Sequence, residues 1–268
     1  MKLAANAFEP LRHRGVIGAL TRRELASRYR GSLFGSAWMV ITPLLMLCIY
    51  TLVFGVIFKT RWPGAAGHGV AAIAVQLYMG LLMNGLLQET MGRAPGLILE
   101  QPNYVTKVVF PLQTLPWVTL LTGLFHFAVG LLLLLLFNLL DGGGLHATLL
   151  CLPLVLAPYA LCLVGLSAWF AALGVYLRDL RQVMPSVITI MMFLSPTFYA
   201  RTNSPPLMQY LMMVNPLTVP IEQARVVVMD GRWPEWGVRG GYAVAALGVC
   251  LLGQWVFGRL RPGFADVI

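Results

Sequence analysis

Residues 20–58 change character halfway along, and this change limits what the whole chain can fold into. The first part carries one acid, Glu24, and four arginines, Arg22, Arg23, Arg28 and Arg30. Residues 34–58 contain no charged side chain. A charge-free run of that length crosses a hydrocarbon core of about 30 Å, because a helix rises about 1.5 Å per residue. Since cationic flanks of a first span stay in the cytoplasm, the sequence predicts that the N-terminus lies inside.

The composition of the chain agrees with a membrane protein. Only 11% of the 268 residues are charged and 58% are apolar, whereas a soluble domain has about 25% charged residues. The net charge of +9 is spread between apolar runs and forms no basic stripe with interleaved aromatics, so we expect no nucleic-acid partner. Membrane lipid is the expected partner of these cations, because anionic headgroups attract them. The predicted fold class is an all-α integral membrane protein.

Apolar runs divide residues 1–268, read as one transmembrane domain, into six predicted transmembrane helices. They are residues 34–58, 70–87, 117–140, 153–177, 183–199 and 240–258. Pro111 and Pro116 are expected to break the apolar run 108–140 near its start, so that the third span begins at about Trp117. With both termini in the cytoplasm, most of the 19 Lys and Arg residues lie on the cytoplasmic side.

Two segments outside the spans also have a predicted structure. Residues 1–32 are interpreted as a cytoplasmic amphipathic segment lying along the membrane surface, with a solvated tail as the alternative for 1–19. Gly31 and Gly35 have the spacing that lets two helices approach closely. In the outer loop 200–239, prolines separate two apolar pieces that are too short to span, which predicts re-entrant helices before the last span.

The spans lack the side chains that ion-coupled transport or intramembrane catalysis needs. They contain no Asp, Glu, Lys or Arg, and their one titratable imidazole, His126, is interpreted as a packing residue. Ser167 lacks the second glycine of a nucleophile elbow. The cysteines and histidines have no metal-ligand spacing. We therefore predict that the chain is no enzyme and binds no metal or cofactor.

A pump with these properties needs an external energy source. The phosphate-binding GxxxxGK[ST] loop is absent, since the three lysines, Lys2, Lys59 and Lys107, do not follow glycine. ATP would therefore have to bind to a partner that contacts the inner loops, chiefly residues 93–107 and 178–181. Simple topological anchoring is the alternative role for the charges of these loops.

Several motifs follow one another in order between about residues 20 and 239. They are Arg23-Glu24-Leu25, Arg28-Tyr29-Arg30, Gly31-Ser32, Gly35, Trp38, Pro43-Leu44, Asn103 to Pro111 with Leu115-Pro116, Tyr176 to Asp179, Phe193 to Pro196 with Phe198-Tyr199, and Asn215-Pro216-Leu217 leading to Glu222 and Arg225. In this order the motifs resemble the membrane subunits of ABC transporters that export polysaccharides such as O-antigen, capsule and teichoic acid precursors. Leu112-Gln113 departs from a charged pair that many members carry.

The resemblance implies a homodimer around a channel, with two ATP-binding cassette subunits beneath it that hold ATP and Mg²⁺. The cargo would be a glycan linked to polyprenyl diphosphate, moved from cytoplasm to periplasm across the bacterial inner membrane. By this resemblance residues 21–32 form an interface or gating helix, 95–110 contribute to the ATPase-coupling surface, and 205–230 form the outer gate.

Individual residues receive roles on the same basis. Arg28, Tyr29 and Arg30 would meet the diphosphate where it enters, with topological anchoring as the alternative. Aromatic faces suit a sugar chain, although an aromatic belt at the membrane interface is an equal alternative; the candidates are Trp38, Tyr50, Tyr78, Trp117, Tyr159, Trp169 and Tyr199. The coupling surface would comprise Asn103, Tyr104, Lys107, Arg178 and Asp179. The outer gate would comprise Asn215, Pro216, Glu222 and Arg225.

Two other readings of the sequence stay open. One is an ABC permease for capsule or teichoic acid precursors, or for small lipophiles; permeases for lipophiles more often carry a large outer domain, and residues 200–239 are too short to supply one. The other is a membrane enzyme of glycan assembly, which the absence of paired carboxylates in the spans disfavours.

Overall fold

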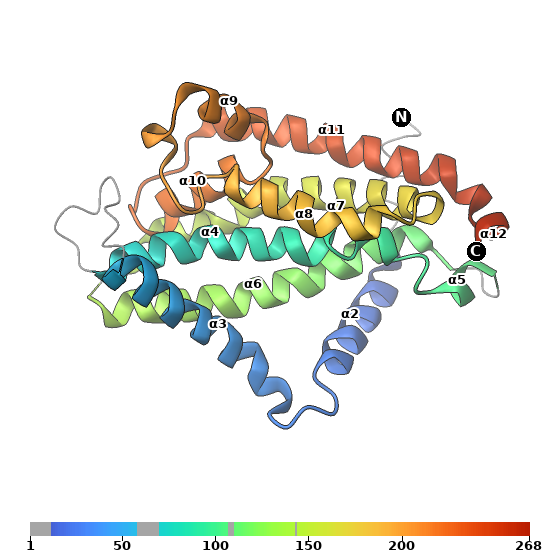
Figure 1. Ribbon diagram of the computed structural model, residues 1–268, viewed down its shortest axis with the longest axis horizontal. Coiled ribbons are helices and arrows are strands. Elements are labelled where there is room, and N and C mark those ends of the chain that lie inside the picture. Colours follow the sequence, from blue (N-terminus) through green and yellow to red (C-terminus); the bar gives the residue numbers. More distant parts are fainter. Residues whose placement is uncertain (1–11, 58–69, 107–109, 143) are drawn as a thin grey trace.

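The computed structural model describes residues 12–57, 70–106, 110–142 and 144–268, and no strand occurs among them. Its long helices lie side by side in one bundle (Figure 1). These are α4 (Val70–Met91), α6 (Leu115–Leu140), α7 (Leu152–Tyr176), α8 (Leu180–Phe193) and α11 (Trp236–Leu260). The all-helical fold class is confirmed for this part of the chain.

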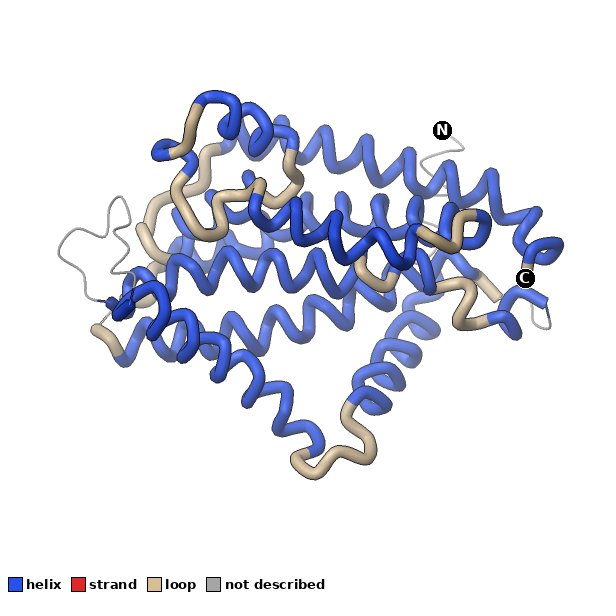
Figure 2. The backbone as a smooth tube through the Cα atoms, in the orientation of Figure 1, coloured by secondary structure: helices blue, strands red, loops and turns tan. Residues whose placement is uncertain are grey.

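The first two helices stand away from the bundle as a V-shaped arch (Figures 1 and 2). The arch consists of α2 (Arg14–Arg28), a turn, η2 (Gly35–Ala37) and α3 (Trp38–Tyr50), which continues as the π-helix η3 (Thr51–Ile57). Gly31 and Gly35 have φ values of 88° and 51° in the turn at its apex, and no neighbouring atom lies within 4 Å of where their Cβ atoms would be. Within the described part of this chain, the predicted close approach of helices at these glycines is therefore wrong: they turn the chain instead.

Short helices join the long ones and fix where each begins. They are η4 (Ala94–Gly96), α5 (Pro102–Thr106), η5 (Leu112–Thr114), η6 (Ala147–Cys151), η7 (Arg201–Asn203), α9 (Pro206–Val214), α10 (Thr218–Val228), η8 (Arg261–Gly263) and α12 (Phe264–Val267). Pro116 and Pro153 lie in the first turns of α6 and α7, where a proline costs no hydrogen bond. Helices therefore begin at prolines where the sequence predicted that a helix would break.

The helix lengths agree with only part of the predicted topology. Among the residues that the structure describes, four stretches are long and apolar enough to cross a membrane: Gly35–Phe54, Leu112–Leu140, Ala147–Tyr176 and Trp236–Val267. The predicted fifth span 183–199 differs most: α8 has 14 residues and ends at Phe193, so at about 1.5 Å per residue it is shorter than a hydrocarbon core. The six-span count, the re-entrant character of α9 and α10 and the sidedness of the termini stay predictions.

Segments predicted to lie inside gather at one end of the bundle. The turn before α8, α5, α12 and the C-terminus share this end, and α9 and the start of α10 lie toward the opposite end (Figure 1). The α2 arm of the arch meets the bundle near the first of these two ends (Figure 1). The bundle therefore separates the predicted inner loops from the predicted outer loop along its length.

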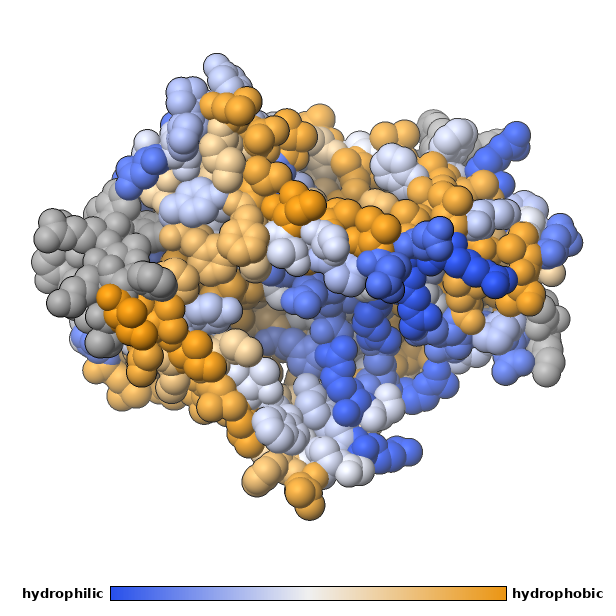
Figure 3. Space-filling view, viewed as in Figure 1, coloured by the Kyte–Doolittle hydropathy of each residue, from blue (hydrophilic) through white to orange (hydrophobic). Residues whose placement is uncertain are grey.

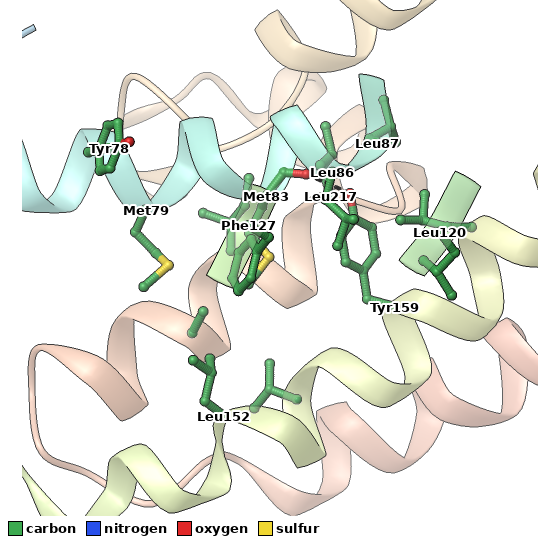
Figure 4. Close-up of a cluster of buried hydrophobic side chains, with 14 of the residues drawn as sticks. Tyr78, Met79, Met83, Leu86, Leu87, Leu120, Phe127, Leu152, Tyr159 and Leu217 are labelled. Carbon is green, nitrogen blue, oxygen red and sulfur yellow. Dashed lines mark hydrogen bonds between the residues drawn. The ribbon is translucent and has the colours of Figure 1, made fainter. Parts of the chain in front are cut away.

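The core of the bundle is built around α4, α6, α7 and α10. Tyr159 of α7 is fully buried and donates a hydrogen bond to the Met83 carbonyl of α4 at 2.9 Å, and these residues lie in the side-chain cluster of Figure 4. The α7–α11 contact relies on glycine instead. A Cβ on Gly253 would fall on the Gly165 carbonyl, so the two backbones touch with nothing between them. By contrast, α3 buries only Leu47.

Candidate functional site

A cavity of about 570 Å³ lies between the arch and the bundle. Its walls come from α2, α3, α4 and α6, with Met192 of α8. Polar side chains line the part beside α2, and apolar side chains of α3 and α4 line much of the rest. The surface divides in the same way, with hydrophilic residues beside α2 and apolar residues over α3 (Figure 3). The cavity is therefore amphipathic along its length.

The polar part of the cavity is organised around one carboxylate, Glu89 of α4, whose side chain is 16% exposed. Arg28 donates to both of its oxygens, at 2.6 and 3.0 Å. Arg93 lies one helical turn further on, 3.7 Å from Glu89, and also donates to Glu24 of α2. Two arginines, one at the end of α2 and one in the turn after α4, therefore converge on the same carboxylate.

The ion pair also changes the acid–base chemistry of Arg28. Burial alone would lower the pKa of its guanidinium, but the hydrogen bond and charge of Glu89 outweigh burial and raise the pKa above its usual value. Arg28 is thus a permanent cation at this end of the cavity.

His126 of α6 joins the same cluster, which corrects its interpretation as a packing residue. Its Nδ1 lies 3.2 Å from an Arg28 nitrogen and its Nε2 lies 3.0 Å from the Tyr29 hydroxyl. Because a guanidinium only donates, Nδ1 accepts this bond, and the ring proton of the neutral tautomer is on Nε2, directed at Tyr29. The imidazole therefore links α2 to α6 as Glu89 links α2 to α4.

The predicted diphosphate residues are divided between two places. Arg28 lines the cavity, whereas Arg30 lies with Arg22 and Met39 around a separate surface depression of about 440 Å³. Tyr29 borders this depression while its hydroxyl meets His126. Helix α2 ends at Arg28 and Arg30 lies in the turn that follows it, so the two side chains are not on one helix face.

The predicted channel aromatics are also dispersed. Tyr50 and Tyr78 line the cavity. The other five lie elsewhere: Trp38 and Trp169 are exposed, Trp117 packs against the core, Tyr159 is inside it, and Tyr199 donates to the Phe193 carbonyl. As described, the single chain places two of these rings on one cavity.

The predicted coupling residues lie at the end of the bundle that carries α5. Asn103 and Tyr104 belong to α5, and the Tyr104 hydroxyl accepts a 3.0 Å hydrogen bond from Arg23 of α2. Arg178 and Asp179 are exposed in the turn between α7 and α8. Lys107 lies outside the described residues.

An ion pair that the sequence did not reveal joins these two inner segments. Arg181 donates to Glu100 at 2.6 Å, although the two residues are far apart in the chain. The pair connects the segment before α5 with the start of α8.

The predicted outer-gate residues converge on the end of α8. Asn215 donates to the carbonyls of Met191 and Leu194 at 2.6 and 2.8 Å. The buried guanidinium of Arg225 donates to three backbone carbonyls, those of Gln76 at 2.9 Å, Pro196 at 2.5 Å and Thr197 at 2.9 Å. Two further contacts complete the group: Glu222 lies 3.4 Å from Arg201, and the Pro216 carbonyl accepts a hydrogen bond from Tyr242.

Sequence reasoning missed Glu89, Arg93 and His126 as site residues. The signal available was the spacing of Glu89 and Arg93, four residues apart at the end of an apolar run. In the described part of the chain, no group of three His, Cys, Asp or Glu side chains could hold a metal ion.

Comparison with known proteins gives the family. The ABC-2 type transporter family matches residues 15–229. The O-antigen export system permease protein RfbA of Myxococcus xanthus is 26% identical over 264 residues, 97% of this chain and 98% of the relative. RfbA of Klebsiella pneumoniae is 22% identical over 251 residues, 93% of each chain. The polysialic acid transport protein KpsM of Escherichia coli is 24% identical over 230 residues, 85% of this chain and 86% of the relative. With its bundle of apolar helices and a family match across most of its length, this chain belongs to the ABC-2 type transporter family.

Proposed function

We propose that this chain is the channel-forming subunit of an ATP-driven exporter of polysaccharide. The cargo is an O-antigen-type glycan linked to polyprenyl diphosphate, moved from cytoplasm to periplasm across the bacterial inner membrane. The observation that carries the proposal is end-to-end similarity to O-antigen export permeases, with 97% of this chain aligned to one of them.

The cavity supports this cargo by its chemistry. A diphosphate requires cationic donors, which Arg28 and Arg93 supply at one end. A sugar requires hydrogen-bonding groups and flat apolar faces, and Tyr50 and Tyr78 offer both. A hydrocarbon tail requires an apolar wall, which α3 presents to its surroundings.

In the proposal, energy comes from a partner. Two ATP-binding cassette subunits, which hold ATP and Mg²⁺, contact the inner end of a homodimer of this chain at Asn103, Tyr104, Lys107, Arg178 and Asp179. Both termini are cytoplasmic, α4 and α8 complete six spans, and α9 and α10 form the re-entrant outer gate. The exposed ends of α5 and the α7–α8 turn lie together at one end of the bundle, as such a surface requires (Figure 1).

A capsule-type polysaccharide is the second candidate cargo. The similarity to KpsM over 85% of this chain favours it. The two cargoes require the same subunit architecture in the proposal and differ in the glycan.

An export assay tests the proposed function. The chain is expressed with its partner ATPase in a bacterium whose own exporter has been deleted, and surface and cytoplasmic glycan are measured separately. We expect the wild-type pair to restore surface glycan, and the double variant Arg28→Ala with Arg30→Ala to leave glycan inside while inserting normally. If the chain purifies without an ATPase and restores no surface glycan, the proposal is wrong.

A further inference from the structure

We propose that the cavity between the arch and the bundle is a binding site for one phosphate-bearing lipid, and that Glu89 occupies the place of its phosphate until the lipid binds. This inference rests on the proposed function and adds to it the place where the lipid anchor of the cargo binds.

The geometry around Glu89 suits a phosphate. Arg28 donates two hydrogen bonds to this carboxylate, at 2.6 and 3.0 Å. A guanidinium fork fits a phosphate in the same way as it fits a carboxylate. Any phosphate that entered the cavity would therefore compete with Glu89 for the same donors.

Glu89 keeps a cationic partner when a phosphate takes the donors of Arg28. One of its oxygens lies 3.7 Å from Arg93. A small side-chain rotation would strengthen this contact, so release of Arg28 leaves no isolated buried carboxylate. The exchange therefore costs little in the protein, as a reversible site requires.

Two polar atoms further along the cavity have no partner among the described residues. The Tyr78 hydroxyl and the Asn84 Oδ1 line it or border it, and neither has a hydrogen-bond partner among the described residues. Both residues are more than nine-tenths buried, with 3% and 7% exposure. Buried polar atoms are normally paired. A ligand that carries hydroxyl groups beside its phosphate would satisfy them, as the first sugar of a glycolipid does.

The remaining wall is apolar and limits the size of the ligand. Pro43, Met46, Leu81, Leu82, Phe127 and Met192 line it. A volume of about 570 Å³ lies in the range of small-molecule sites and takes a headgroup with the start of a hydrocarbon chain. It is too small for a polymer. The cavity therefore fits the lipid end of the cargo with its first sugar, and the rest of the glycan must run elsewhere.

One position allows the cavity to be filled without touching its charges. Gly85 of α4 lines the cavity, and no neighbouring atom lies within 4 Å of where its Cβ would be. The variant Gly85→Leu places an isobutyl group into this space and raises helix propensity. Gly248→Leu is the matched control, because Gly248 is also helical and open but lies on α11, away from the cavity.

The experiment measures binding of farnesyl diphosphate to the purified complex with its ATPase, in nanodiscs of phosphatidylcholine. We expect Gly85→Leu to weaken binding at least tenfold and Gly248→Leu to leave it unchanged. Glu89→Gln removes the competing charge, so it should tighten binding about tenfold, in keeping with the strength of a charged hydrogen bond. Weaker binding in Glu89→Gln, or equal binding in Gly85→Leu, would overturn the proposal.

Further binding measurements distinguish an isoprenoid diphosphate from a bilayer phospholipid as the ligand. Farnesol should bind at least tenfold more weakly than farnesyl diphosphate, and equal binding would overturn recognition of the phosphate. In nanodiscs that contain phosphatidylglycerol, loss of probe binding identifies bilayer phospholipid as an occupant of the same phosphate site. Retained binding identifies the isoprenoid diphosphate as the preferred occupant.

The export assay distinguishes failure of this inference from failure of the proposed function. If Gly85→Leu loses probe binding but still exports glycan at the wild-type rate, the cavity does not bind the cargo during export. The proposed function as an exporter is then unaffected. If the wild-type complex binds the probe as expected but exports no glycan, the lipid site stands and the proposed function is wrong.

Discussion

The contact between α7 and α11 gives the sharpest test of the structure, because a single methyl group should disrupt it. A Cβ on Gly253 would fall on the Gly165 carbonyl oxygen and 2.9 Å from the Gly165 Cα. Carbon atoms in contact prefer about 3.5–4.0 Å, so Gly253→Ala forces the helices apart by about 1 Å or more. Overpacking of this kind costs about 1–3 kcal/mol.

Gly248→Ala supplies the control within the same helix. No atom lies within 4 Å of where its Cβ would be, so the substitution brings only the gain in helix propensity, about 1 kcal/mol. Gly253→Ala receives the same gain and must also meet the steric cost. We therefore expect the control to be the more stable of the two variants by about 1–3 kcal/mol.

The measurement is the thermal unfolding of both variants in the same detergent, followed by intrinsic fluorescence. For a chain of this size, about 2 °C of Tm corresponds to each kcal/mol, so the Gly253→Ala variant should unfold about 2–6 °C below the Gly248→Ala variant. Equal Tm values would refute the reasoning, since they would show that the two backbones are not in contact.

Three further predictions test other contacts. Arg225→Met leaves the buried Pro196 and Thr197 carbonyls without their donor and should destabilise the protein by about 3 kcal/mol, measured by the same thermal unfolding. Asn215→Ala removes a single uncharged side chain from the same region and should cost less, about 1–2 kcal/mol; a larger loss than in Arg225→Met would contradict the ranking. Reversal of the Arg181–Glu100 pair tests coupling: Arg181→Glu should lower recovery of the partner ATPase on purification, and adding Glu100→Arg should restore it.

Much of the helical framework could be predicted from apolar runs and prolines. Residues 117–140 and 153–177 are almost the observed α6 and α7, because runs of apolar residues with a proline at the start define a helix locally. The end of α8 could not be predicted. The apolar run continues beyond Phe193, but the helix stops there. The carbonyls of Met191, Leu194 and Pro196 instead accept hydrogen bonds from Asn215 and Arg225, which are distant in sequence.

The polar cluster of the cavity was hidden for the same reason. Arg28 meets Glu89 and His126 across 61 and 98 positions of the chain, and no periodicity reports such a pairing. Arg28 was nevertheless selected, because it belongs to Arg28-Tyr29-Arg30, one of the motifs that carry the family resemblance. The sequence therefore predicted Arg28 as a site residue but not Glu89 and His126, the side chains that it contacts.

The π-helix at the end of α3 has a consequence for how such chains can change in length. Thr51–Ile57 is wound with one residue more per hydrogen-bonded turn than an α-helix. Loss of one residue from this segment would return it to ordinary α-helical winding. Pro43, Met46 and Tyr50, which line the cavity, lie before it and would keep their orientation. Natural variants of this chain should therefore tolerate single-residue deletions in residues 51–57, where deletions elsewhere in the arch would rotate the cavity wall.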